Sequence, residues 1–258
     1  MKRFFIITLV LIASFVYLNN LYAQDLKIVD IKGEVLLRPR EISTWREAVM
    51  GEILYQDYEL QTKENSECTI SFDDNLDKVL TLKENTQIKI EDIINIVIKL
   101  SKGRVFSLLE NMGKEETFQI RTPTAVAGPR GTGLKVEVVE GTTFAVCYDG
   151  KIYVGGLDKD GNLVFEEIIG EGTGAQVFEG KLELFELTDE DKEEWNRFMD
   201  FIQDLKDKFG EDEGFHNEGA QNVDEMRDEQ RDDFREEIIR QLRKEKEDAE
   251  SSQQELQY

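Results

Sequence analysis

Residues 118–138 read FQIRTPTAVAGPRGTGLKVEV, and this stretch decides the fold. Polar and apolar residues alternate at both ends, in FQIRT and LKVEV, which indicates two half-buried strands. Between the strands, the small residues from Thr124 to Gly128 permit close backbone approach, and glycine allows torsions that other residues resist. Arg130 follows in a tight, apolar-flanked turn. We expect its planar guanidinium to donate hydrogen bonds to carbonyl oxygens there, a structural role that needs no ligand.

The same alternation extends in both directions, from about Leu26 to Leu187. Short apolar runs are separated by turn signals at regular intervals. Many short strands without a helical period between them predict a mainly β domain over residues 24–187, either an antiparallel β-sandwich or a β-solenoid-like roll. The turn signals are Lys32-Gly33, Asp73-Asp74-Asn75, Lys102-Gly103, Glu140-Gly141, Asp149-Gly150 and Asp160-Gly161.

Several motifs within residues 26–156 occur in the order of one family's signature. A strand ends in Thr-Pro, small residues follow, Arg-Gly-Thr comes next, and a strand pair closes at Gly-Lys-Ile. The chain therefore resembles the FecR domain family, and the matching residues are ones that shape the domain. They are Thr122, Pro123, Gly128, Arg130, Gly131, Thr132 and Gly150.

Three places depart from the family pattern. Gln56 stands where a glycine is usual, Pro129 replaces an aliphatic residue, and Gly133-Leu134 replaces a bulkier residue and an aromatic one. These departures leave the fold assignment intact, but they can change a surface that a partner contacts.

The resemblance implies a non-enzymatic domain of the cell envelope. In its best-known setting, the FecR domain belongs to a membrane-anchored regulator whose cytoplasmic domain contacts a sigma factor, while the periplasmic part senses an outer-membrane transducer. Only Met1 to Arg3 precede the apolar N-terminal segment of this chain. We therefore expect a stand-alone exported FecR-domain protein without the anti-sigma role.

Residues 1–23 have the layout of a secretory signal peptide. Lys2 and Arg3 form a basic start, an apolar run extends to Leu18, and Ala23 offers a small residue for cleavage. We expect export to the periplasm or envelope of a Gram-negative-type bacterium. The alternative is an uncleaved anchor, in which case the chain is attached to the membrane.

The hydrophobic period changes after the β domain. Thr188 followed by three acidic residues is typical of a helix N-terminus, because acids are favourable against the helix dipole. Apolar residues at spacings of three and four predict an amphipathic helix over residues 188–209, which either docks on the β domain or pairs with a copy of itself. A linker over 210–222 and a charged tail over 223–258 follow. The tail is expected to be a solvated helix, a weak coiled coil or partly disordered, and self-association through 188–258 stays open.

Composition excludes several classes of function. The 258 residues carry a formal charge of −23, and such a chain is repelled by phosphate backbones, so nucleic acid is excluded as a main partner. The one histidine, His216, lies in a Gly/Glu-rich linker, where it cannot serve a catalytic triad or a histidine-rich metal site. We predict no catalytic, cofactor-binding or metal-ligating residues and no enzyme activity. A carboxylate-based hydrolase ranks last, because no pair of acids stands out.

Two motifs invite a ligand but are better explained as turns. Asp158, Asp160 and Asn162 alternate as in a calcium loop, yet Gly161 comes at the fourth position and not the sixth. A hairpin turn is the expectation there. Residues 170–175, GEGTGA, lack the Lys-Ser/Thr of a phosphate loop and are expected to be a loop before a last strand, AQVF.

The two cysteines, Cys68 and Cys147, both lie in strand-like runs of the exported part. Oxidation is permitted in that compartment, so a disulfide between them is one alternative. Two buried thiols that act as small hydrophobic residues are the other.

The sequence thus favours an envelope interaction protein whose β domain binds a protein or glycan partner and whose helical tail oligomerises or docks. Sheet edges that accept an added strand are one physical route to such binding. The alternative function is an envelope signal-transduction component that acts with a separate membrane regulator.

Overall fold

The computed structural model describes residues 26–40, 42–113, 116–129 and 133–211. This part of the chain is mainly β, with one C-terminal helix, which confirms the predicted fold class. The signal segment 1–23, His216 and the predicted tail 223–258 lie outside the described residues. The strands are β1 (Leu26–Lys32), β2 (Val35–Arg38), β3 (Arg46–Glu47), β4 (Ile53–Leu54), β5 (Glu59–Thr62), β6 (Glu67–Ser71), β7 (Lys78–Leu82), β8 (Gln87–Asp92), β9 (Val97–Leu109), β10 (Gln119–Arg121), β11 (Ala125–Pro129), β12 (Gly133–Val139), β13 (Thr142–Asp149), β14 (Lys151–Leu157), β15 (Leu163–Gly170), β16 (Thr173–Phe178) and β17 (Lys181–Glu186), and the helix is α2 (Asp189–Glu211).

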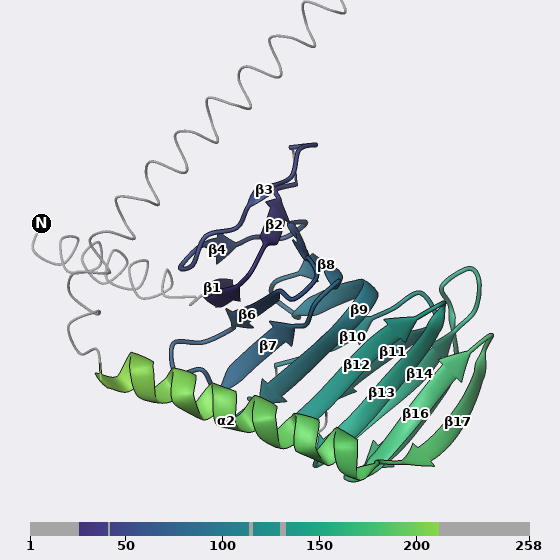
Figure 1. Cartoon of the computed structure of the whole chain (residues 1–258). Helices are drawn as coiled ribbons and strands as arrows, with labels where there is room; N and C mark the ends of the chain where they lie inside the picture. Colours follow the sequence, from purple (N-terminus) through teal and green to yellow (C-terminus); the bar gives the residue numbers. More distant parts are fainter. Residues whose placement is uncertain (1–25, 41, 114–115, 130–132, 212–258) are drawn as a thin grey trace, which may run out of the picture.

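The strands form two packed sheets that share one long strand (Figure 1). Sheet A has the order β4-β1-β6-β7-β9-β12-β13-β16-β17. Sheet B has the order β3-β2-β5-β8-β9-β10-β11-β14-β15. The first half of β9 lies in sheet B and the second half in sheet A. Among the described pairs only β9 and β10 run parallel, so the expected antiparallel dominance is confirmed.

The main core fills the space between the two sheets. The period-two alternation of the sequence places one side chain in two on the inner face, as in Ile88 and Ile90 of β8 and Ile98 and Leu100 of β9. All four are fully buried. The alternation therefore selects the residues of this core.

Strand β9 passes from one sheet to the other at Gly103. The φ angle of Gly103 is +88°, and a Cβ atom there would lie 2.5 Å from the Cα of Thr86. The Thr86 hydroxyl accepts a hydrogen bond from the Arg104 amide at 2.9 Å and donates one to the Arg104 carbonyl oxygen at 3.1 Å. This close contact fixes where β9 leaves sheet B.

Helix α2 lies across the outer face of sheet A and forms a third layer (Figure 1). Its N-terminus is a capping box: the Asp191 amide donates to the Thr188 hydroxyl, and the Thr188 amide donates to the Asp191 carboxylate. Of the two expected arrangements, α2 docks on its own β domain. The ring of Trp195 stacks on Tyr148 with centroids 4.6 Å apart, and Phe198 stacks on Phe106 at 5.3 Å.

One departure from the family pattern belongs to this docking. A Cβ atom on Gly133 would lie 2.6 Å from the ring of Trp195. The bulkier residue that the family usually has at this position would therefore displace the indole. A glycine at position 133 leaves the space that the Trp195 indole of α2 occupies.

Charged contacts fix both ends of α2 to sheet A. Lys135 of β12 is only 6% exposed, and its ammonium donates to Asp191 at 2.8 Å and to Glu194 at 3.3 Å. At the far end of the helix, Lys206 donates to Asp77 at 2.9 Å. Partial burial raises the pKa of Asp191, but hydrogen bonds from Lys135 and Thr188 outweigh this, so the pKa of Asp191 is lowered.

Replacing Asp191 with asparagine is expected to lower the free energy of unfolding at pH 7 by about 1.5–3 kcal/mol, the range for hydrogen bonds to charged groups. Because the pKa of Asp191 is lower in the folded state, its contribution is complete above the unfolded-state pKa of about 3.9 and is lost as the pH falls through the folded-state value. Urea unfolding monitored by Trp195 fluorescence between pH 7 and pH 2 should show the two proteins converging at the acidic end. Asp189→Asn is the matched control, because Asp189 is in the same helical turn and its side chain is 98% exposed. A curve for Asp191→Asn that runs parallel to the wild type would contradict the expectation.

The disulfide alternative for Cys68 and Cys147 is wrong in this structure, where both are buried free thiols. Cys68 lies on β6 and Cys147 on β13, and β7, β9 and β12 lie between them in sheet A. Four strand spacings of about 4.8 Å give a separation of about 19 Å, whereas a disulfide needs Cα atoms within about 7 Å. Burial raises the pKa of both thiols, to about 11 for Cys147.

Two smaller expectations are also resolved. The expected loop at GEGTGA is a tight turn at Glu171-Gly172, and AQVF lies within β16, but the last strand is β17. Within the described ranges, no helix is long and apolar enough to span a membrane.

Candidate functional site

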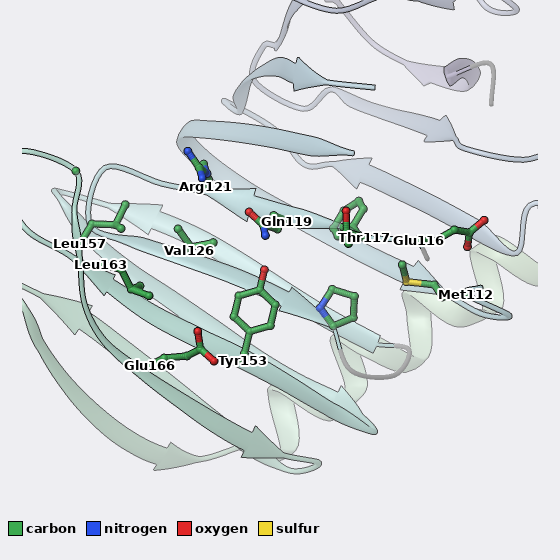
Figure 2. A pocket seen from close by; sticks show the side chains of 13 residues that line it. Met112, Glu116, Thr117, Gln119, Arg121, Val126, Tyr153, Leu157, Leu163 and Glu166 are labelled. Atoms are coloured by element: carbon green, nitrogen blue, oxygen red, sulfur yellow. The ribbon is translucent and has the colours of Figure 1, made fainter. Parts of the chain in front are cut away.

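A groove lies on the outer face of sheet B, the face opposite to the layer formed by α2 (Figure 2). Its volume is about 530 Å³, within the usual range of ligand sites. Outward-facing side chains of β10, β11, β14 and β15 line it. Because the described helix covers only sheet A, this groove is the candidate binding site.

Strand register determines which side chains meet in the groove. Arg121 of β10 pairs with Val126 of β11, Val126 with Gly155 of β14, and Gly155 with Glu166 of β15. Residues paired across a sheet share one face, so this row runs across the groove floor. Arg121 and Glu166 lie at the two ends of this row, and the Leu163 side chain covers Gly155 between them.

The ring of Tyr153 lies over Gly128 and forms the centre of the groove. A Cβ atom on Gly128 would come within 2.4–2.5 Å of three atoms of the phenol. Figure 2 shows the ring on the sheet surface, with Gln119 beyond its hydroxyl and Glu166 beside it. Burial raises the pKa of Tyr153 to about 12, with further effects from Glu166, Arg121 and the Gln119 side chain.

The groove carries unequal charge at its two sides. Arg121 is exposed and has no ion-pair partner among the described residues. Lys99, its cross-strand neighbour, is 4.0 Å from the nearest carboxylate, that of Glu91. Glu166 lies at the β15 side, and Glu116 is neutralised by Lys78 at 2.7 Å. An anionic group is therefore favoured near β10.

The predicted signature residues lie mostly at structural positions. The Thr122 hydroxyl accepts from the Ala125 amide at 2.8 Å and shares a hydrogen bond with the Thr143 hydroxyl at 2.7 Å. Thr143 also shares one with Thr124, at 2.7 Å. Because Thr143 belongs to sheet A, this network ties the exposed turn at Pro123 to the opposite sheet.

The remaining signature residues are separated from that network. Gly150 has a φ angle of +73° in the turn between β13 and β14. Arg130, Gly131 and Thr132 lie outside the described residues. Gly128 does not line the groove itself but lies against the ring of Tyr153, which does. The close approach expected from the small residues is made by this ring.

No sequence motif singles out the groove residues Gln119, Arg121, Tyr153 and Glu166. A signal was present for Gln119, Arg121 and Tyr153, because each alternates along its strand with a buried neighbour, such as Ile120 or Ile152. Glu166 has no such signal, because its neighbours in β15 are half-buried or exposed. Outward positions on one strand do not reveal which outward positions of other strands lie beside them. Register supplies that information.

A second groove, of about 590 Å³, lies between α2 and the turns of sheet A. Lys83 is paired there with Glu67 at 3.1 Å, and Arg104 with Glu194 at 2.8 Å. Because these charges already neutralise one another, the second groove is the weaker candidate.

The suspected calcium motif is a turn, as expected. The Asp158 carboxylate accepts hydrogen bonds from the amides of Asp160 at 2.9 Å and Asn162 at 2.8 Å. Gly161 has a φ angle of +82°, which suits a hairpin turn.

The family described as FecR protein matches residues 58–153. Two crystal structures of a candidate anti-sigma factor from Parabacteroides distasonis ATCC 8503 are similar at 15% identity. Their TM-scores are 0.42 and 0.40, over 53% and 50% of this chain. The chain spans 63% and 59% of the length of those structures. No curated protein matches the chain.

The family match carries the identification. The matched residues include strands β10 and β11, which line the groove, and they include Thr122, Gly128 and Tyr153. FecR proteins are regulatory and associated with the cell envelope, so the match supports a role in signal transduction. Residues 58–153 form a FecR domain.

Proposed function

We propose that this protein is a non-enzymatic interaction module of the cell envelope, located in the periplasm, which binds its partner on the outer face of sheet B. The observation that carries the proposal is the asymmetry of the two sheets. Helix α2 covers the outer face of sheet A, whereas the outer face of sheet B presents a groove with an unpaired cation, Arg121. An exposed groove with a few convergent polar groups is the usual form of a binding site.

The FecR domain favours a signalling purpose for this binding. In that role the protein passes an envelope signal to a separate membrane regulator. Helix α2 packs on the outer face of sheet A and leaves the groove of sheet B open. We therefore propose that the signalling partner binds to sheet B.

Affinity capture from an envelope extract of the source organism tests the site. The baits are the full chain, its Arg121→Glu variant and its Arg197→Glu variant, compared at moderate salt. Arg197 lies on α2 with its side chain 66% exposed, so its variant is a control with the same change of charge on the opposite layer. We expect a partner that the wild type and Arg197→Glu retain and that Arg121→Glu loses. Equal capture by all three baits, or no capture, would refute the proposed site.

A further inference from the structure

We propose that the groove of sheet B binds an acidic glycan, with a pyranose ring stacked on Tyr153 and a sugar carboxylate bound by Arg121. This inference rests on the proposed function and names its ligand class. Two independent observations carry it, one from the aromatic ring and one from the cations.

The first observation is the position of Tyr153. Its ring lies against the backbone of Gly128, so one face is used by the protein and the other faces the groove (Figure 2). A half-buried aromatic ring held in this way is a rigid apolar platform that loses little entropy on binding. The C–H groups on one face of a pyranose ring match such a platform in size and polarity.

The side chains around the platform suit sugar hydroxyls. Gln119 offers an amide, Glu166 a carboxylate and Arg121 a planar guanidinium, and all three line the groove with Tyr153. Amide and carboxylate groups hydrogen-bond neighbouring hydroxyls in pairs, and guanidinium binds a carboxylate through two parallel hydrogen bonds.

The second observation is a row of cations across neighbouring strands. Lys89 of β8 is paired in register with Lys99 of β9, and Lys99 with Arg121 of β10. Like charges directly opposite each other destabilise a sheet. Lys89 is neutralised by Asp57 at 2.7 Å, but Arg121 has no ion-pair partner among the described residues. Asp57 and Glu91 are the partners of Lys89 and Lys99, so Arg121 is the cation of this row that is available to an anion.

The charges also orient the ligand. Glu166 lies at the β15 side of the groove and repels a carboxylate, whereas Arg121 and Lys99 lie toward β9 and β10. The acidic group of the sugar therefore points toward β10.

Ligand-observed NMR titration of the full chain tests the inference with trigalacturonate as the probe. Its methyl ester is the matched neutral probe, and triglutamate is the acidic peptide. We expect trigalacturonate to bind, the ester to bind about tenfold more weakly, and triglutamate to bind more weakly still. Arg121→Gln should abolish the difference between trigalacturonate and its ester. Tyr153→Ala should weaken both sugars at least tenfold, whereas Tyr153→Phe should retain binding because it keeps the ring.

Trp195 fluorescence and circular dichroism show whether each variant is folded, because Trp195 belongs to α2 and packs on Tyr148 of sheet A, away from the groove. Absent binding of both sugars, or binding indifferent to Tyr153→Ala in a folded variant, would overturn the glycan inference. Triglutamate binding as tight as that of trigalacturonate would also overturn it, in favour of a peptide site. If the glycan inference fails in any of these ways but envelope capture still depends on Arg121, the proposed function is supported and only the ligand class is wrong.

Discussion

Replacing Gly103 with alanine is expected to lower the free energy of unfolding by about 2–5 kcal/mol. Roughly 1–2 kcal/mol comes from a φ angle of +88° that side chains resist, and about 1–3 kcal/mol from overlap with Thr86. The overlap is severe because the nearest Thr86 atoms include its Cα, which cannot rotate away. Urea unfolding of the purified chain, followed by circular dichroism, measures the loss.

Gly141→Ala is the matched control. Gly141 has a φ angle of +81°, but a Cβ atom there would have no neighbour within 4 Å. The control should therefore lose only the torsional part, about 1–2 kcal/mol. Equal losses for the two variants would mean that the contact with Thr86 does not fix the passage of β9 between the sheets.

Phe198→Ala is expected to cost about 3–5 kcal/mol and to loosen α2 from sheet A. Phe198 is 3% exposed, and its ring packs between Phe106 and Trp195 at 5.3 and 5.1 Å. Removing the ring leaves a cavity in the apolar cluster between α2 and sheet A and admits water to the indole. We expect the Trp195 emission to shift to longer wavelength and the urea midpoint to fall.

Phe209→Ala makes the same change of side chain in the same helix at a position that is 39% exposed. A change within about 0.5 kcal/mol is expected for this control, as for most surface substitutions. The other tryptophan, Trp45, contacts Arg38 away from α2 and provides a constant background. If Phe198→Ala left both the emission and the midpoint unchanged, the aromatic stack would not be what holds the helix.

Gly103 and Phe198 hold different layers of the protein, and the two variants test what each layer contributes to the groove of sheet B. Gly103 keeps the sheets in register, and register brings Arg121, Tyr153 and Glu166 to one groove. Phe198 keeps the outer face of sheet A covered. If loss of α2 leaves binding at Arg121 intact, the helix has a structural role only.

The period of the apolar residues predicted a mainly β region followed by an amphipathic helix, and the structure has both. Alternation in FQIRT and KIYVGG selected the buried residues Ile120, Ile152 and Val154, because a strand turns successive side chains to opposite faces. Spacings of three and four in α2 selected Phe198 and Ile202 as its buried stripe for the corresponding reason.

What each of those faces packs against follows from the pairing of distant segments. The stripe of α2 could have packed on a second helix, and the two thiols could have been joined, since periodicity carries no information about partners. Cys68 and Cys147 are separated because β7, β9 and β12 pair between them. Likewise Arg121 and Glu166, 45 positions apart in the chain, line one groove because two further strands pair between theirs. Local pattern fixes the direction of a side chain, whereas pairing between distant strands fixes its neighbours, and a binding site is made of neighbours.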